Sequence, residues 1–109
     1  DFTFIDDIVE ANILAATHGA PGSVFNVGGG TQATVKDVLQ IIRENIGDFG
    51  VDFGERQKGD ARKTSADTSK AAKEIGFSPK VSLRDGIAAE VEWLKNCARA
   101  GLDTGVDLS

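Results

Sequence analysis

The apolar periodicity between Val35 and Ile46 is the feature that most constrains how this chain can fold. Apolar side chains recur there at the i, i+3, i+4 and i+7 spacing of one helical face. Thr34 stands before the run with Asp37 three residues later, which is typical of a capping box, and Gly47 follows as a stop signal. This stretch predicts an amphipathic helix over 35–46 that packs one face against another element.

The same criteria predict three further helices, over 6–17, 69–75 and 83–100. Asp6 or Asp7 can cap the first of them, because a carboxylate is stabilised at the positive end of a helix. The apolar stripe of this first helix is broad, which indicates burial against more than one neighbour. We therefore expect about four helices in all.

Extended segments lie between these helices. Ser23 to Val27 reads as a strand, and Val51 to Phe53 as a shorter one. Gly28, Gly29 and Gly30 follow the first strand. A glycine-rich turn can hold phosphate through its backbone N–H groups, but the G-x-G-x-x-G spacing is absent, so a tight turn is the favoured interpretation. The order of elements predicts an α/β fold with a small, mixed, few-stranded sheet.

A charged loop runs from Gly54 to Ala71 between the second strand and the third helix. Four of its cations surround the acid Asp60; they are Arg56, Lys58, Arg62 and Lys63. Guanidinium forks match phosphate oxygens, and a nearby acid can orient an arginine or accept a sugar hydroxyl. The residues alone favour an ordinary solvated loop and leave a site for a phosphorylated ligand as the second interpretation.

Charge and composition exclude several classes of function. The 109 residues carry 12 basic and 17 acidic side chains, a net charge of −5, which argues against binding nucleic acid or an anionic membrane surface. Cys97 is the only cysteine and His18 the only histidine, so an internal disulfide, a thiolate cluster and a histidine-rich metal site are excluded. No apolar run approaches the roughly 18 residues of a membrane span, and we expect a cytoplasmic protein.

Three phrases together resemble one family. They are DFTFIDDIVEANI (1–13), SVFNVGGGTQATVKDVLQII (23–42) and GDARKTSADTSKAAKEIGFSPKVSLRDGI (59–87). In this order they resemble the C-terminal part of the NAD-dependent nucleotide-sugar epimerases and dehydratases, which are extended short-chain dehydrogenase/reductases, with UDP-glucose 4-epimerase as the nearest type. The resemblance implies that residues 1–100 form a nucleotide-sugar-binding domain, and the polar residues 101–109 read as a flexible tail.

The resemblance also implies what this chain lacks. In the family an N-terminal Rossmann domain holds NAD, which oxidises the sugar C4 hydroxyl by hydride transfer and returns the hydride to the other face. The family's dinucleotide fingerprint and its Y-x-x-x-K catalytic pair are absent, and the chain contains no tyrosine at all. We therefore expect an inactive domain of a longer enzyme that binds neither NAD nor a metal and meets a UDP-hexose only as one wall of the active site.

Site residues follow from the same resemblance. Phe2 matches the aromatic residue beside the nucleotide, and Asp60 matches the acid that reaches the ribose. The family arginine that clamps the diphosphate stands three residues before this acid, where this chain has Gln57, so either the loop is reshaped or Arg56 takes the role from a shifted position. Arg62 matches a further basic residue, for which a plain surface role is the alternative.

Thr64 matches a residue in the wall of the sugar pocket. A large tyrosine at that position narrows the pocket, and a small residue leaves room for an N-acetyl group. The resemblance therefore implies that N-acetylated hexoses are tolerated.

Two alternatives to an epimerase stay open. One is a dehydratase or decarboxylase of the same family, and the other is a non-catalytic, stand-alone binding or interaction domain. Because a helix face that packs against a Rossmann domain meets water in this chain alone, we expect self-association or an exposed apolar patch on the first helix.

Overall fold

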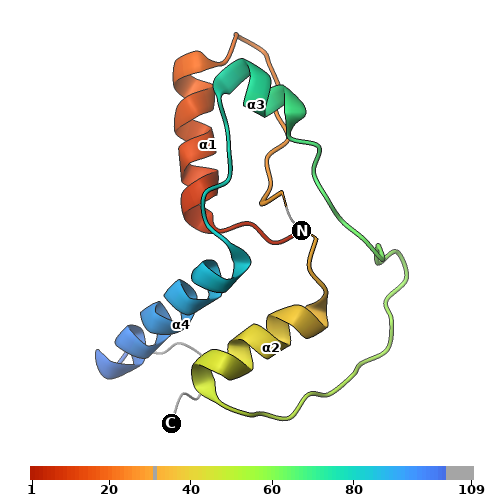
Figure 1. Cartoon of the computed structure of the whole chain (residues 1–109), viewed down its shortest axis with the longest axis vertical. Helices are drawn as coiled ribbons and strands as arrows, with labels where there is room; N and C mark the ends of the chain where they lie inside the picture. Colours follow the sequence, from red (N-terminus) through yellow and green to blue (C-terminus); the bar gives the residue numbers. More distant parts are fainter. Residues whose placement is uncertain (31, 103–109) are drawn as a thin grey trace.

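The computed structural model describes residues 1–30 and 32–102. Its elements are four α-helices (Figure 1): α1 (Ile5–His18), α2 (Val35–Ile46), α3 (Ser69–Ile75) and α4 (Leu83–Arg99). All four lie within a residue or two of the ranges that the periodicity predicts. The tail expected over 101–109 lies outside the described residues from position 103 onward.

The prediction of a small mixed sheet is wrong. Among residues 1–30 and 32–102 there is no strand, and the segments around Val24 and Phe53 run as unpaired extended chain. The physical reason is that alternating β-branched and aromatic residues favour extended backbone, whereas a strand also needs a second backbone to exchange hydrogen bonds with. The side chains of Val24 and Phe53 are 76% and 84% exposed, so both segments carry strand-like sequence with no sheet beside them.

α1 and α3 pack against each other and enclose a small core. Its buried members are Ala11, Ala71, Ile75 and Phe77, with Leu14, Ala15, Phe25 and Val27 partly buried around them. Two of the partly buried residues, Phe25 and Val27, come from the extended segment that was predicted as a strand. This segment therefore contributes apolar side chains to a helical core instead of a backbone ladder to a sheet.

α2 and α4 form the second helix pair. The backbone N–H of Asp37 donates to Thr34 Oγ1 at 3.1 Å, and the N–H of Thr34 donates to Asp37 Oδ2 at 2.8 Å, which confirms the predicted capping box. Ser82 caps α4 by accepting the N–H of Asp85. An apolar groove of about 360 Å³ lies between the two helices.

Asp7 joins the α1–α3 pair to the segment that leads into α4. The prediction that Asp6 or Asp7 caps the first helix is wrong. The N-cap residue of α1 is Phe4, without a side-chain cap, and Asp7 is buried in the first turn instead. Its carboxylate accepts the backbone N–H groups of Lys80 and Val81 at 2.9 and 3.2 Å. The carboxylate therefore accepts hydrogen bonds from the backbone that leads into α4, and it does not cap its own helix.

The molecule leaves much apolar surface uncovered. Its accessible area is 8194 Å², against roughly 5,800 Å² expected for a monomer of this length. Ile5, Val9 and Ile13, one face of α1, are each at least half exposed, which agrees with the patch expected on the first helix. None of the described helices has both the length and the apolar character needed to cross a membrane.

Candidate functional site

A cavity of about 720 Å³ lies where three distant stretches of the chain meet, and we call it the site cavity. Its lining residues are Asp1, Phe2, Gln32, Ala33, Thr34, Val35, Ala61, Arg62, Lys63 and Thr64. They come from the N-terminal segment, from the approach to α2 and from the charged loop. A hollow of this size with a few converging polar groups is typical of a small-molecule site.

The structure brings three of the five sequence-predicted site residues to this cavity. Phe2, Arg62 and Thr64 line it, and Arg56 and Asp60 do not. These two lie further along the same exposed loop, where Arg56 Nη2 donates to the backbone carbonyl oxygen of Asp60 at 3.3 Å. The Arg56 guanidinium is therefore bonded to the backbone of Asp60 and not to its carboxylate.

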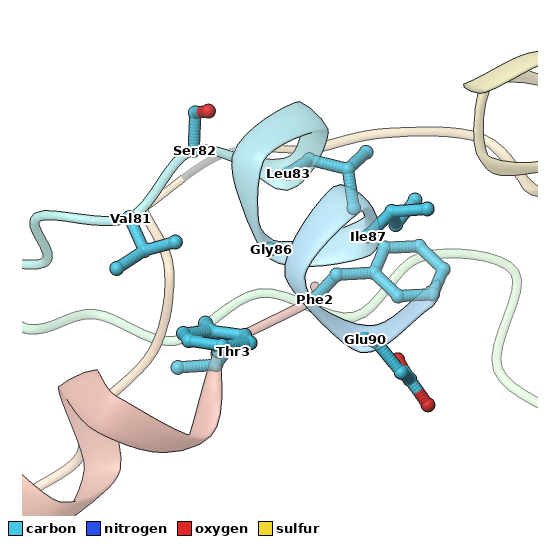
Figure 2. Close-up of a pocket in the computed structure, with 9 residues that line it drawn as sticks. Phe2, Thr3, Val81, Ser82, Leu83, Gly86, Ile87 and Glu90 are labelled. Carbon is cyan, nitrogen blue, oxygen red and sulfur yellow. The ribbon is translucent and has the colours of Figure 1, made fainter. Parts of the chain in front are cut away.

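Phe2 forms a wall that the site cavity shares with the interior of the second helix pair. Its ring lies beside Leu83 and Ile87 of α4 (Figure 2). The same residue lines the α2–α4 groove and a smaller cavity of about 120 Å³. Gly86 makes room here, because a Cβ at that position would lie 3.2 Å from the ring of Phe4. The aromatic wall is thus supported by packing on α4.

Asp1 lines the site cavity and was not among the predicted residues. Its backbone nitrogen lies 2.9 Å from both the carbonyl oxygen and the hydroxyl of Thr64. Its carboxylate accepts the N–H of Gly29 at 3.2 Å and that of Ala66 at 3.4 Å. The glycine triplet beside Asp1 was the only sequence signal for this arrangement, since small residues in a row indicate that another backbone approaches closely.

The glycine turn is closed by the protein itself. A Cβ at Gly28 would lie 2.7 Å from Asp1 Oδ2, and one at Gly29 would lie 2.3 Å from the carbonyl oxygen of Phe2. Because the N–H of Gly29 already donates to Asp1, this group is not free to hold a phosphate. The close approach of Asp1 and Phe2 is what requires small residues at Gly28 and Gly29.

Charge at the cavity is suited to an anion. Arg62 and Lys63 contribute two cations to the lining, and both carboxylate oxygens of Asp1 are engaged by backbone N–H groups. Beyond Ala66, the hydroxyl and then the backbone N–H of Ser69 lower the pKa of Asp67, which keeps this acid ionised at the start of α3. Within the described part of the chain, no cluster of acidic, histidine or cysteine side chains is suited to a metal ion.

A second hollow of about 470 Å³ lies beside α1 and α4 and is lined by Thr3, Phe4, Ile5, Ala89, Glu90 and Trp93. Glu90 is its one charged group, and Ile5 and Trp93 are each 62% exposed. This hollow continues the exposed face of α1. Its apolar lining suits another protein surface better than a polar small molecule.

The chain is similar to several known proteins, although no family model matches it. It is 36% identical over 95 residues to a dTDP-glucose 4,6-dehydratase of Streptomyces griseus, a match that covers 85% of this chain and 29% of that protein. It is 32% identical over 97 residues to a UDP-glucose 4-epimerase of Mycolicibacterium smegmatis, covering 88% of this chain and 31% of that one.

Solved structures give the same result. A UDP-glucuronic acid 4-epimerase of Bacillus cereus, in complex with UDP-glucuronic acid and NAD, matches with a TM-score of 0.80 and 34% identity, over 88% of this chain and 32% of that one. MoeE5, also in complex with UDP-glucuronic acid and NAD, matches with a TM-score of 0.82 and 35% identity, over 88% and 33%. The chain thus spans about a third of the length of the proteins it matches.

Proposed function

Because the homologues and structural neighbours of this chain are NAD-dependent epimerases and dehydratases of nucleotide-sugars, we propose that it is the nucleotide-sugar-binding, C-terminal part of a UDP-sugar 4-epimerase. The observation that carries the proposal is the site cavity, where Phe2, Arg62 and Thr64 converge from segments distant in the sequence. Two cations, an aromatic ring and a hydroxyl suit the diphosphate, the nucleoside and the sugar of such a ligand.

Each residue has a defined role in this proposal. Phe2 lies beside the nucleotide, and Arg62 binds the diphosphate from within the cavity. Arg56 and Asp60 contact the diphosphate and the ribose once the exposed loop that carries them approaches the ligand. Thr64 forms the wall on the sugar side, and its small side chain leaves room for an N-acetyl group.

The remainder of the reaction belongs to other parts of the enzyme. NAD does not fit the described residues of this chain: the glycine turn lacks the dinucleotide spacing, and the N–H of Gly29 is occupied by Asp1. Since the chain has no tyrosine, we place the catalytic pair and NAD on a Rossmann domain. The exposed α1 face, with Ile5, Val9 and Ile13, is the surface we assign to that domain. We expect the enzyme in the cytoplasm.

A dehydratase is the second candidate, and the 36% identity with a dTDP-glucose 4,6-dehydratase supports it. Both reactions begin with the same oxidation of the sugar, so the binding wall described here serves either. The product distinguishes them, because an epimerase returns a sugar of the same mass and a dehydratase releases water.

The test uses the full-length protein that contains this chain, with NAD and UDP-glucose, UDP-N-acetylglucosamine or dTDP-glucose. Chromatography and mass spectrometry of the products are expected to show a C4 epimer of a UDP-sugar. Arg62→Ala should weaken UDP-sugar binding about tenfold, as the loss of a charge-assisted hydrogen bond does. Arg99→Ala, at the far end of α4, is the matched control and should bind normally. Failure of the unmodified protein to bind or convert any of the three would refute the proposal.

A further inference from the structure

We propose that Asp1 is a positioning residue, whose carboxylate holds the Thr64 wall of the site cavity against the glycine turn and so determines the room available to the sugar. The inference rests on the proposed function. It goes beyond it because it assigns Asp1 a part in holding the site together: each carboxylate oxygen accepts a backbone N–H, one from Gly29 and one from Ala66.

Residues 61–66 of the charged loop are held to the rest of the molecule by hydrogen bonds to this one residue. Gly29 and Ala66 lie 28 and 65 positions away from Asp1 in the sequence. Within the described residues, every hydrogen bond that joins positions 61–66 to another segment has Asp1 as its partner. Bonds to a carboxylate are stronger than those between neutral groups. Without Asp1, the segment that carries Thr64 would lose each of these hydrogen bonds.

The same contacts orient the Thr64 hydroxyl. Its oxygen lies 2.9 Å from the nitrogen of Asp1, which also lies 2.9 Å from the carbonyl oxygen of Thr64, so a single N–H at Asp1 is shared between these two acceptors. A hydroxyl that accepts in this way still has its own hydrogen to donate. Thr64 lines the site cavity, so this hydrogen is available to an acceptor in the cavity, such as a sugar oxygen or the carbonyl of an acetamido group.

Gly28 offers an independent way to disturb the same contacts. A Cβ added there would approach Asp1 Oδ2 to 2.7 Å and the Cβ of Ala66 to 3.0 Å. Gly28→Ala therefore pushes the Asp1 carboxylate and the Ala66 side chain away from position 28 without removing any polar group. If Asp1 acts by position, this variant must alter ligand binding in the same direction as Asp1→Asn.

The experiment is calorimetric titration of the full-length protein with UDP, UDP-glucose and UDP-N-acetylglucosamine. For Asp1→Asn and Gly28→Ala we expect about a tenfold loss in affinity for the two sugar nucleotides, since small misplacements of a binding wall have effects of that order. Affinity for UDP, which lacks the sugar, should change less than about twofold. Asp52→Asn removes one negative charge from an exposed loop position and is the matched control, with unchanged affinities.

Hydrogen exchange of the Gly29 and Ala66 amides gives a second readout that needs no ligand. Both amides should exchange faster in Asp1→Asn than in the unmodified protein. If the unmodified protein binds a sugar nucleotide more tightly than UDP, and both variants bind the two ligands with the same ratio of affinities, the inference is overturned and the proposed function stands. If the unmodified protein binds none of the ligands, the proposed function fails and the inference with it. A uniform loss for all three ligands would identify Asp1 as merely structural.

Discussion

The carboxylate of Asp7 accepts the backbone N–H of Lys80 at 2.9 Å, across 73 positions of sequence. Asp7 is 2% exposed, and its second oxygen accepts the N–H of Val81. Lys80 also reaches back to α1, where its Nζ lies 2.7 Å from Glu10 Oε1. One buried acid on α1 thus accepts the backbone N–H groups of the segment that leads into α4. These bonds fix the position at which α4 starts.

Replacing Asp7 should destabilise the chain strongly. Asp7→Ala leaves two backbone N–H groups without their acceptor and should cost about 2–4 kcal/mol. Asp7→Asn keeps one acceptor oxygen and should cost less. Urea unfolding followed by circular dichroism measures both. Asp6→Asn, its exposed neighbour, is the control, and an Asp7→Ala variant as stable as this control would contradict the role assigned to the buried acid.

Gly76, which ends α3, tests backbone strain without any change in packing. Its φ of 72° lies in the left-handed region, and a Cβ there would meet no other atom within 4 Å. Gly76→Ala should therefore cost about 1–2 kcal/mol from backbone conformation alone. Gly54, whose φ is not positive and whose surroundings are also open, supplies the comparison. Gly54→Ala should be neutral or slightly stabilising in the same denaturation experiment.

Acid should loosen the start of α2. The backbone N–H of Thr34, and then its hydroxyl, hold the pKa of Asp37 below its ordinary value of 3.8. Because the folded-state pKa is the lower one, the contribution of this carboxylate is fully present above 3.8 and is lost as the pH falls through the folded value. A circular dichroism titration downward from about pH 5 should show this loss, and Asp37→Asn should flatten the curve. An identical titration curve for both proteins would show that protonation of Asp37 does not cause the loss of helix at low pH.

Thr64→Tyr should change the choice of sugar. A tyrosine at the Thr64 position fills part of the site cavity next to Asp1. The affinity of the variant for UDP-N-acetylglucosamine should therefore fall about tenfold relative to its affinity for UDP-glucose. Thr64→Ser keeps the hydroxyl and the room, and should behave like the unmodified protein. Competition binding with the full-length protein measures the ratio. Failure of the unmodified protein to accept the acetylated sugar would contradict the size argument.

The exposed face of α1 should make the 109-residue chain associate with itself. Ile5, Val9 and Ile13 are 62%, 50% and 58% exposed, and apolar surface in such a row favours contact with any second apolar surface. We expect concentration-dependent sedimentation and binding of a dye for apolar surface. Ile13→Lys should reduce both. Sedimentation as a strict monomer without dye binding would show that this face needs no partner.

The helices were predictable because their signals are local. The period of apolar residues from Val35 to Ile46 and the pair Thr34 and Asp37 lie within a few residues of one another, and the structure confirms both. The strand around Val24 was predicted by equally local residues and is wrong. A helix satisfies its own backbone, whereas a strand depends on a neighbour that no local pattern can supply.

The predicted site divides in the same way. Phe2, Arg62 and Thr64 were chosen from the family resemblance, and their assigned roles remain predictions, although all three line one cavity. Nothing in the residues around Asp1 indicated that its carboxylate would engage Gly29 and Ala66. The glycine triplet was predicted only as a tight turn, and its contacts with Asp1 and Phe2 came from the structure.

By itself, the sequence determined where the helices form, which of their faces are apolar and which polar residues are available for a site. Only the tertiary structure decided that Asp7 would hold the entry to α4, that Asp1 would hold residues 61–66 and that the extended segments would form no sheet. The reason is that helix propensity and capping act between residues a few positions apart. Each of the other outcomes depends on groups that are dozens of positions apart and meet only once the helices have packed.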